Sequence, residues 1–125
     1  MIIGIGVDLV DIARIRAIIS KWDVHFLHKI YTSPEIKYCE SKNENRFQSY
    51  AGLFAAKEAF SKALGTGFRN LKWKEIEIKE DNFGKPIIYL TGKASEIASK
   101  RSITKINLSI SHTKQLAIAQ VIIEN

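Results

Sequence analysis

The sequence predicts an α+β fold in which an antiparallel sheet packs against helices. After an N-terminal strand, helical periodicity dominates the first half of the chain, whereas alternating apolar and polar segments dominate the second half. The 125 residues are 46% hydrophobic and include two prolines, with no Ser/Gly-rich tract, charge block or internal repeat. We therefore expect residues 1–125 to form a single compact domain with a continuous core.

The first predicted element is a strand over residues 2–10, in which branched apolar residues alternate with small or acidic ones. One face of this strand carries Ile3, Ile5, Val7 and Leu9. The other face carries Gly4, Gly6 and Asp8. Glycine weakens a strand unless another group must approach closely, so an acidic residue beside this bare face indicates a ligand or a metal ion. The alternative is that Asp8 only faces water or begins the turn into the next helix.

Three helical segments are predicted next. Asp11 is placed to cap a helix that runs to about Trp22. The predicted buried face of this helix consists of Ile12, Ile15, Ile19 and Trp22. Residues 26–31 are expected to form a short helix, and a further helix is expected to begin at Pro34 with Ser33 as its cap.

Two basic residues, Arg14 and Lys21, project together from the opposite side of the first helix. Basic residues on an amphipathic helix commonly form nothing more than a solvated face, and this interpretation stays open. The functional interpretation is a docking surface for an acidic helix of a partner protein.

A long helix is predicted from about Arg46 to Leu64, followed by Gly65-Thr66-Gly67. At about 100° per residue, one arc of this otherwise apolar helix contains Lys57, Glu58, Ser61 and Lys62. Glu58 and Lys62 have the favourable i,i+4 order, so a solvated face also explains them. Together with Asp8, however, they offer two carboxylates and nearby ammoniums, which can hold a hard cation against phosphate oxygens. The two glycines permit a left-handed cap or a close approach to a ligand.

The second half of the chain is predicted to consist mainly of strands. Its elements are a hairpin of strands 73–79 and 87–90 with a turn at 81–86, a helix over 93–100, and strands over 105–112 and 115–123. The polar residues near the end of the strand over 105–112 include Ser109, Ser111 and His112. Hydroxyl and imidazole groups can bind phosphate, although simple exposure of polar strand residues is the commoner explanation.

The formal net charge of +6 indicates an anionic partner but does not identify it. The lysines are spread along the chain and do not form a basic stripe with stacking aromatic residues, so we expect no nucleic-acid binding. A lone Cys39 cannot form an internal disulfide, and no Cys/His cluster indicates zinc. With neither signal-peptide features nor a long apolar run, the sequence predicts a soluble, cytoplasmic protein with no membrane association.

Four blocks of the sequence resemble, in the same order, the holo-acyl-carrier-protein synthases, the small-subunit class of 4′-phosphopantetheinyl transferases. The blocks are residues 4–10 (GIGVDLV) followed by Arg14-Ile15, residues 54–59 (FAAKEA) with 62–67 (KALGTG), Gly84-Lys85-Pro86, and residues 109–112 (SISH). They span nearly the whole chain. The first two together are specific, whereas the last two are weak by themselves. The resemblance implies the 4′-phosphopantetheinyl transferase fold and a homotrimer with active sites between subunits.

The resemblance also implies roles for individual residues. Asp8 and Glu58 are expected to bind Mg²⁺ and, with Lys62, to form the catalytic set. Lys62 is also expected to bind a phosphate of coenzyme A. Other contacts with coenzyme A are expected from Lys57, Gly65, Thr66, Gly67, Lys85, Pro86, Ser109, Ser111 and His112. Arg14 and Lys21 are expected to dock acyl carrier protein.

The implied reaction moves the 4′-phosphopantetheine arm of coenzyme A to a serine of apo acyl carrier protein, in support of fatty acid biosynthesis, and releases adenosine 3′,5′-bisphosphate. The base that accepts the serine proton is open among Glu58, a metal-bound hydroxide and His112. One position departs from the family pattern: many members have Arg before the Phe of Phe-Ala-x-Lys-Glu, whereas this chain has Leu53. Lys57 and Arg46 are candidates to supply the missing positive charge.

Two other functions are compatible with the residues alone. A nucleotide pyrophosphohydrolase could use the same carboxylates and lysines, but it needs no acidic protein partner and often carries more metal-binding carboxylates. A non-enzymatic basic binding module would give Asp8 and Glu58 a purely structural role.

Overall fold

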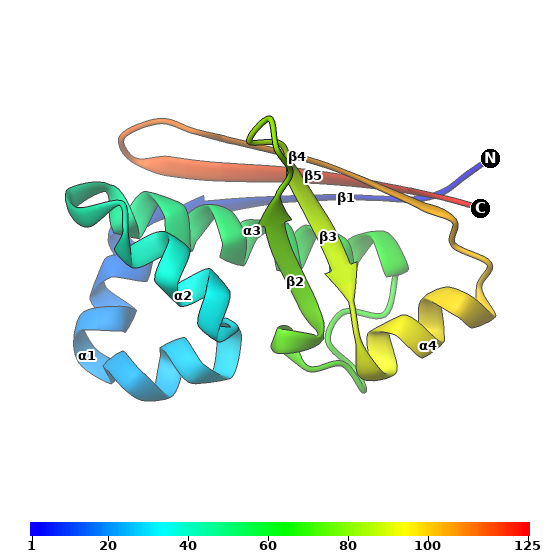
Figure 1. Cartoon of the computed structure of the whole chain (residues 1–125), viewed down its shortest axis with the longest axis horizontal. Helices are drawn as coiled ribbons and strands as arrows, with labels where there is room; N and C mark the ends of the chain where they lie inside the picture. The colour runs from blue at the N-terminus through cyan, green and yellow to red at the C-terminus, as the bar shows by residue number, and fades with distance from the viewer.

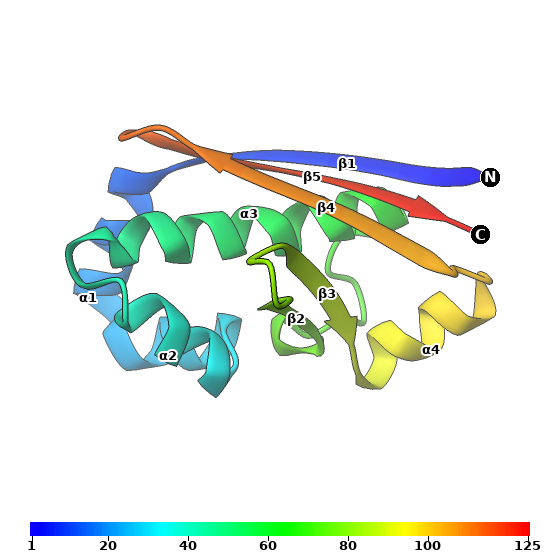
Figure 2. The same cartoon turned by 45° about the horizontal axis from the view of Figure 1, so that its top comes forward.

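The computed structural model describes residues 1–125 and contains two antiparallel sheets and four α-helices. In chain order the elements are β1 (Ile2–Asp11), α1 (Ile12–Ile30), α2 (Ser33–Glu40), the 3₁₀ turn η1 (Asn43–Asn45), α3 (Arg46–Leu64), the 3₁₀ turn η2 (Trp73–Glu75), β2 (Ile76–Glu80), β3 (Pro86–Leu90), α4 (Gly92–Lys100), β4 (Lys105–His112) and β5 (Leu116–Glu124). The three-stranded sheet covers one side of α3, and the other helices and the β2–β3 hairpin lie on its other side (Figure 1; Figure 2). This arrangement confirms the predicted α+β class.

The three-stranded sheet combines the N-terminal strand with the last two strands of the chain. Its order is β1-β5-β4, so β1 and β4 form the two edges. Asp8 of β1 and Ile110 of β4 both lie opposite Ala119 of the central strand. The side chains of Val121 and Ile123 on β5 are fully buried. The sheet thus supplies one wall of the core, and α3 packs along it.

Gly4 and Gly6 of β1 lie directly against the backbone of α3. A Cβ atom at Gly4 would overlap the carbonyl oxygen of Ala63, and one at Gly6 would overlap that of Ala59. The α3 backbone occupies the space beside the two glycines, so the group that approaches them closely is the helix, and the expectation of a ligand or metal ion at Asp8 stays a prediction. The absence of side chains here lets α3 approach β1 closely enough for its polar residues to reach Asp8.

Helix α1 is broken at Asp23, whose φ of 40° and ψ of −109° are not helical. The break separates the predicted helix ending near Trp22 from the predicted short helix that follows. Asp11 caps the first part as predicted, because its Oδ1 accepts a 3.1 Å hydrogen bond from the Ala13 amide. Of the predicted buried face, Ile12, Ile15 and Ile19 are buried. Trp22 is 56% exposed because the chain turns away at the next residue, so its predicted burial is wrong.

Helix α2 is capped by Thr32, one residue before the predicted cap Ser33. The Thr32 amide donates to Glu35 Oε1 at 2.8 Å, and the Glu35 amide donates to Thr32 Oγ1 at 3.4 Å. This reciprocal pair is a capping box. Pro34 lies in the first turn, where its missing N–H leaves no helical hydrogen bond unmade.

The predicted hairpin is formed by β2 and β3, but its first strand begins at Ile76 and not at Trp73. Residues 73–75 form the turn η2, because Glu75 Oε1 accepts the Lys72 amide at 2.8 Å and closes a tight cap. At the hairpin tip, Asp81 Oδ1 accepts the amides of Phe83 and Lys85 at 2.8 and 2.9 Å.

Helix α3 has the predicted bounds and ends at Gly65, which adopts the left-handed conformation with φ of 81°. No helix of the protein combines the length and the apolar character needed to cross a membrane.

Candidate active site

The four polar residues predicted to share one arc of α3 divide into two pairs. Lys57 and Ser61 are buried, with 0% and 1% of their surface exposed. Glu58 is half-buried and Lys62 is exposed. Because the second pair lies about 100° further around the helix, it faces the edge of the sheet while the first pair faces the core. The helical period correctly predicts that the four residues share an arc. It does not show that one side of this arc faces the core and the other side faces the edge of the sheet.

The outer pair meets β1 at Asp8. Lys62 Nζ lies 3.0 Å from Asp8 Oδ1 and donates a 3.1 Å hydrogen bond to the Val7 carbonyl oxygen. The Asp8 side chain is 15% exposed and that of Lys62 is 51% exposed, so the ion pair lies where solvent and ligands can reach it. Residues 54 positions apart in the sequence therefore converge at one edge of the sheet.

Glu58 interacts electrostatically with both Asp8 and Lys62. Partial burial raises the pKa of Glu58 above its usual range, the negative charge of Asp8 raises it further, and the Lys62 ammonium lowers it. The net effect is upward, so Lys62 does not fully compensate the two carboxylates. Two carboxylates that oppose each other's ionisation are stabilised by an additional cation between them.

The chemistry of this donor set fits a hard divalent cation. Mg²⁺ is usually bound by one or two protein carboxylates and completes its coordination with water and phosphate oxygens. No group of three or more His, Cys, Asp or Glu residues is placed to hold a metal ion. Asp8 and Glu58 therefore fit a cation that binds together with a phosphorylated substrate, and not a metal enclosed by protein ligands alone.

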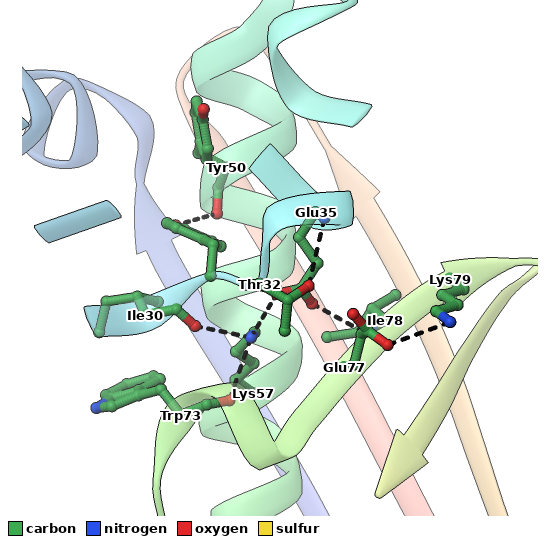
Figure 3. Close-up of polar contacts among 10 residues, drawn as sticks. Ile30, Thr32, Glu35, Tyr50, Lys57, Trp73, Glu77, Ile78 and Lys79 are labelled. Atoms are coloured by element: carbon green, nitrogen blue, oxygen red, sulfur yellow. Dashed lines mark hydrogen bonds and ion pairs between the residues drawn. The ribbon is translucent and has the colours of Figure 1, made fainter. Parts of the chain in front are cut away.

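The inner residue Lys57 takes part in a buried network (Figure 3). Its Nζ donates to Glu35 Oε1 at 2.7 Å and to the carbonyl oxygens of Ile30 and Trp73 at 2.8 and 3.2 Å. Since an ammonium has three protons, none is free for a phosphate. The predicted contact of Lys57 with coenzyme A is therefore withdrawn, because the side chain is directed into the core.

Glu35 is a residue that sequence reasoning missed. Its Oε1 accepts from Thr32 and Lys57, and its Oε2 accepts from the Ile78 amide at 2.8 Å. The carboxylate is 1% exposed and joins α2, α3 and β2. The Thr-x-x-Glu spacing at residues 32–35 was the available signal, since it predicts a capping box and hence an inward-turned carboxylate.

The Gly65-Thr66-Gly67 loop follows directly from the helical turn that carries Lys62. Gly65 and Gly67 have φ values of 81° and 61°, and no atom lies within 4 Å of a Cβ built at either position. The turn conformation, and not crowding, therefore requires these glycines. Thr66 is exposed beside them, and Lys85 is also exposed, on the hairpin.

A second candidate site is a cavity of about 570 Å³ beside β4. The residues around it come from α2, the connection between α2 and α3, the first half of α3, the hairpin and β4, and they include the predicted ligands Pro86 and His112. Leu53 also lines this cavity. The position that departs from the family pattern thus lies in the same cavity as two of the predicted coenzyme A contacts.

Ser109 and Ser111 lie apart from His112. Leu108 is buried and Ile110 lines the cavity, so the alternate residues Ser109 and Ser111, which are exposed, face the outer side of the sheet. His112 shares the inner side with Ile110 and lines the cavity. The strand therefore divides the three predicted ligands between its two faces.

The carboxylate cluster and the cavity do not meet within one chain. Asp8 is on one edge strand and His112 is on the other, with β5 between them. On α3, Glu58 lies nine positions after the cavity residue Ser49, which is about two and a half turns of the helix. The two side chains therefore leave the helix on opposite sides. The helix thus separates the two sites.

The predicted partner-binding residues of α1 are both exposed. Arg14 and Lys21 have no carboxylate within ion-pair distance, and the Lys21 ammonium lies 5.3 Å from the centre of the Trp22 ring. Two basic groups and an exposed aromatic ring are therefore available on one helix surface.

Comparison with known proteins identifies the family. Residues 4–121 match the family model described as the 4′-phosphopantetheinyl transferase superfamily. The holo-[acyl-carrier-protein] synthase of Halothermothrix orenii is 46% identical over 122 residues, which cover 98% of this chain and 97% of the relative. The chain therefore belongs to the 4′-phosphopantetheinyl transferase superfamily.

Solved structures agree with this assignment. The holo-[acyl-carrier-protein] synthase of Neisseria meningitidis superposes with a TM-score of 0.91 at 33% identity, covering 100% of both chains. That of Helicobacter pylori, in complex with coenzyme A, gives a TM-score of 0.85 at 36% identity, covering 96% of this chain and 99% of the other. The predicted family and its fold are confirmed.

Proposed function

We propose that this chain transfers the 4′-phosphopantetheine arm of coenzyme A to a serine of apo acyl carrier protein, and so acts as a holo-[acyl-carrier-protein] synthase. The observation that carries this proposal is the convergence of Asp8, Glu58 and Lys62 at one edge of the sheet. Likeness over the full length of relatives with that name supports it, and a relative of the same fold binds coenzyme A.

The reaction is a phosphoryl transfer at the pyrophosphate of coenzyme A. The serine oxygen forms a bond to the phosphorus that carries the pantetheine arm, and the bond from this phosphorus to the bridging oxygen breaks. The serine loses its proton, and the bridging oxygen leaves as part of adenosine 3′,5′-bisphosphate. Such a reaction depends on positioning and charge neutralisation more than on covalent help from the protein.

Asp8 and Glu58 are the residues that would hold Mg²⁺. When bound, the ion supplies positive charge to the pyrophosphate oxygens. Lys62 contributes a further ammonium, and because half of its side chain is exposed, it can turn from Asp8 toward a phosphate. Lys62, together with the ion that Asp8 and Glu58 would hold, would orient the pyrophosphate and stabilise the negative charge that develops on the leaving oxygen.

The cavity beside β4 is proposed to receive the nucleotide end of coenzyme A. Its volume of about 570 Å³ lies in the range of small-molecule sites. The predicted ligands Pro86 and His112 line it, and the Asp81 carboxylate accepts the amide of Lys85, the residue before Pro86. Because the pyrophosphate belongs at the carboxylates, the cavity and the carboxylates would have to come from neighbouring subunits.

A homotrimer with active sites between subunits is therefore proposed. The outer face of the sheet exposes a row of apolar side chains, between 39% and 61% exposed, which are Ile5, Val7, Leu9, Leu116 and Ile118. An apolar face of this kind indicates an interaction surface. Light scattering should give three times the mass of the chain, and a monomer at micromolar concentration would contradict this proposal.

Arg14 and Lys21 are proposed to dock the carrier protein through an acidic helix. Their exposure and the net charge of +6 support this role. A cytoplasmic location is also proposed, and the single buried Cys39, which has no disulfide partner, is compatible with it.

The function is tested by incubating the protein with coenzyme A, Mg²⁺ and an apo carrier protein and measuring the intact mass of the carrier. A gain of one phosphopantetheine group is expected, and chelation of the metal should prevent it. Consumption of coenzyme A without modification of the carrier would instead indicate a pyrophosphohydrolase. No change in either substrate would favour the basic binding module.

A further inference from the structure

Helix α4 bridges the two ends of the segment that connects α3 to β2. At the start of α4, the Lys93 amide donates to Glu75 Oε2 at 2.6 Å. At its end, Arg101 Nη1 donates to the Leu64 carbonyl oxygen at 2.6 Å. The connecting residues 65–75 therefore begin and end at positions that are tied to the same helix.

The backbone that carries Arg101 is itself fixed, because α4 ends in a Schellman motif. In this motif the Ser102 amide donates to the Ser99 carbonyl oxygen at 3.0 Å, and the Ile103 amide donates to that of Ala98 at 2.9 Å. Ser102 has the left-handed φ of 56° that the motif requires. The Arg101 side chain therefore extends from a well-defined turn toward the end of α3.

The acceptor of this bond belongs to the last turn of α3. Carbonyl oxygens in the last turn of a helix have no partner within the helix, and they form the negative end of the helix dipole. A guanidinium that donates to one of them makes a charge-assisted hydrogen bond. The Arg101 side chain is partly buried and forms no ion pair with a carboxylate. Its recorded polar contact is the Leu64 carbonyl oxygen, so its positive charge acts at the end of α3.

The last turn of α3 also carries Lys62, and residues 65–67 follow it directly. Lys62 ties this turn to β1 while its ammonium bonds to Asp8. In the proposed reaction the ammonium turns toward a phosphate, and this tie is lost. The side-chain contact that then still holds the turn is the bond from Arg101 to Leu64.

We infer that Arg101 is a positioning residue for coenzyme A. By holding the Leu64 carbonyl oxygen, it keeps the last turn of α3 and residues 65–67 in the arrangement that receives the pyrophosphate, without touching the substrate itself. This inference rests on the proposed function, and it adds a residue that lies outside the four sequence blocks of the family resemblance.

The first measurement is binding of coenzyme A by calorimetry. Arg101→Met should weaken binding about tenfold, which corresponds to one lost charge-assisted contact of about 1.4 kcal/mol. Arg101→Lys keeps a cationic donor and should stay within about threefold of wild type. The matched control is Lys100→Met, which removes an exposed charge from the neighbouring position of the same helix and should bind like wild type.

Transfer kinetics separate positioning from a general loss of structure. In Arg101→Met the KM for coenzyme A should rise about tenfold, because only a fraction of the molecules then has the turn in its binding arrangement. The kcat and the KM for the carrier should stay near wild type. The melting temperature should stay close to that of wild type, since the Glu75 contact and the Schellman motif still hold α4.

Amide hydrogen exchange without ligand separates positioning from a direct contact with phosphate. The amides of Gly65 and Gly67 donate to the carbonyl oxygens of Lys62 and Ser61 at 3.0 and 3.3 Å, so they should be protected in wild type. In Arg101→Met these two amides should exchange about tenfold faster, while the amides of the central strand β5 keep their wild-type rates.

Three results would overturn the inference. They are unchanged coenzyme A affinity in Arg101→Met, unchanged exchange at Gly65 and Gly67, or a parallel rise of both KM values together with a much lower melting temperature. If Arg101→Met does not fold, Arg101→Gln, which keeps a neutral donor, is measured in its place with the same expectations. Failure of the proposed function would appear instead as a wild-type protein that neither binds coenzyme A nor modifies the carrier.

Discussion

Lys57 Nζ lies 2.7 Å from Glu35 Oε1, and both side chains are fully buried. Burial lowers the pKa of Lys57, and the charge and hydrogen bond of Glu35 raise it in opposition. The pair joins the helix that carries Glu58 to the start of α2, and through Ile78 to β2. It therefore fixes the position of α3 relative to α2 and β2. Lys57 is the neighbour in sequence of Glu58, the proposed metal ligand.

Breaking this pair should destabilise the fold strongly. Lys57→Met leaves the Glu35 carboxylate buried without its cation, and we expect a loss of about 3–5 kcal/mol in the free energy of unfolding. The double variant Lys57→Met/Glu35→Gln should lose less than the sum of the two single variants, because it leaves no buried charge. Urea denaturation measures all four proteins, and additivity within about 0.5 kcal/mol would contradict the coupling.

Glu58→Gln should lower activity and raise stability together. The pKa of Glu58 is higher in the folded protein than in the unfolded chain, so its ionised form opposes folding. The wild type therefore loses stability as the pH rises from below the unfolded value of about 4.3 through the raised folded value. In chelator, Glu58→Gln should melt above wild type at pH 7, and the difference should vanish toward pH 4.

Glu58→Gln and Asp8→Ala should each lose most of the Mg²⁺-dependent transfer, because each removes one of two proposed metal ligands without removing core volume. Carrier mass and thermal melts are measured side by side. Near-normal turnover of either variant at ordinary Mg²⁺ concentration would exclude the two-carboxylate site.

Lys62→Ala should weaken coenzyme A binding and slow transfer, since a phosphate contact acts in both the ground state and the transition state. We expect a rise in KM and a fall in kcat, each of about threefold, so that kcat/KM falls about tenfold, the size of one lost contact of about 1.4 kcal/mol. Lys72→Ala, an exposed lysine outside both sites, is the matched control. Unchanged kinetics with coenzyme A would show that Lys62 only forms part of a solvated helix face and does not bind a phosphate.

Arg14→Glu/Lys21→Glu should raise the KM for the carrier far more than the KM for coenzyme A, because these exposed charges are proposed to steer an acidic partner. Salt screens such charges over about 8–10 Å, so raising its concentration should weaken wild type and reduce its difference from the variant. Steady-state kinetics with each substrate varied in turn, at low and high salt, measure both effects. An equal carrier KM for both proteins at low salt would leave α1 without a docking role.

Local patterns predicted the elements and part of the site. Strand alternation and the helical period identified β1 and α3, because both depend on neighbours within a few positions. The Asp11 cap and the left-handed Gly65 are likewise local, and the structure confirms them. The proximity of Asp8 to Lys62 was inferred from paired charges and from a family resemblance, and the structure confirms it.

The direction of each polar side chain on α3 was decided only by packing. Sequence placed Lys57 and Glu58 on one arc, but a helical period does not reveal which neighbour covers each part of that arc. The approach of α3 to the glycines of β1 sets the rotation of the helix. This rotation turns Lys57 toward Glu35 and leaves Glu58 beside Asp8.

The separation of the two sites was also decided by tertiary structure. The order β1-β5-β4 puts Asp8 and His112 on opposite edges, and this order depends on pairing between the first and last strands of the chain. Composition and spacing predict that strands exist, because alternation is a property of each segment by itself. They do not predict which segments pair, because that choice depends on how much apolar surface every possible partner buries against α3.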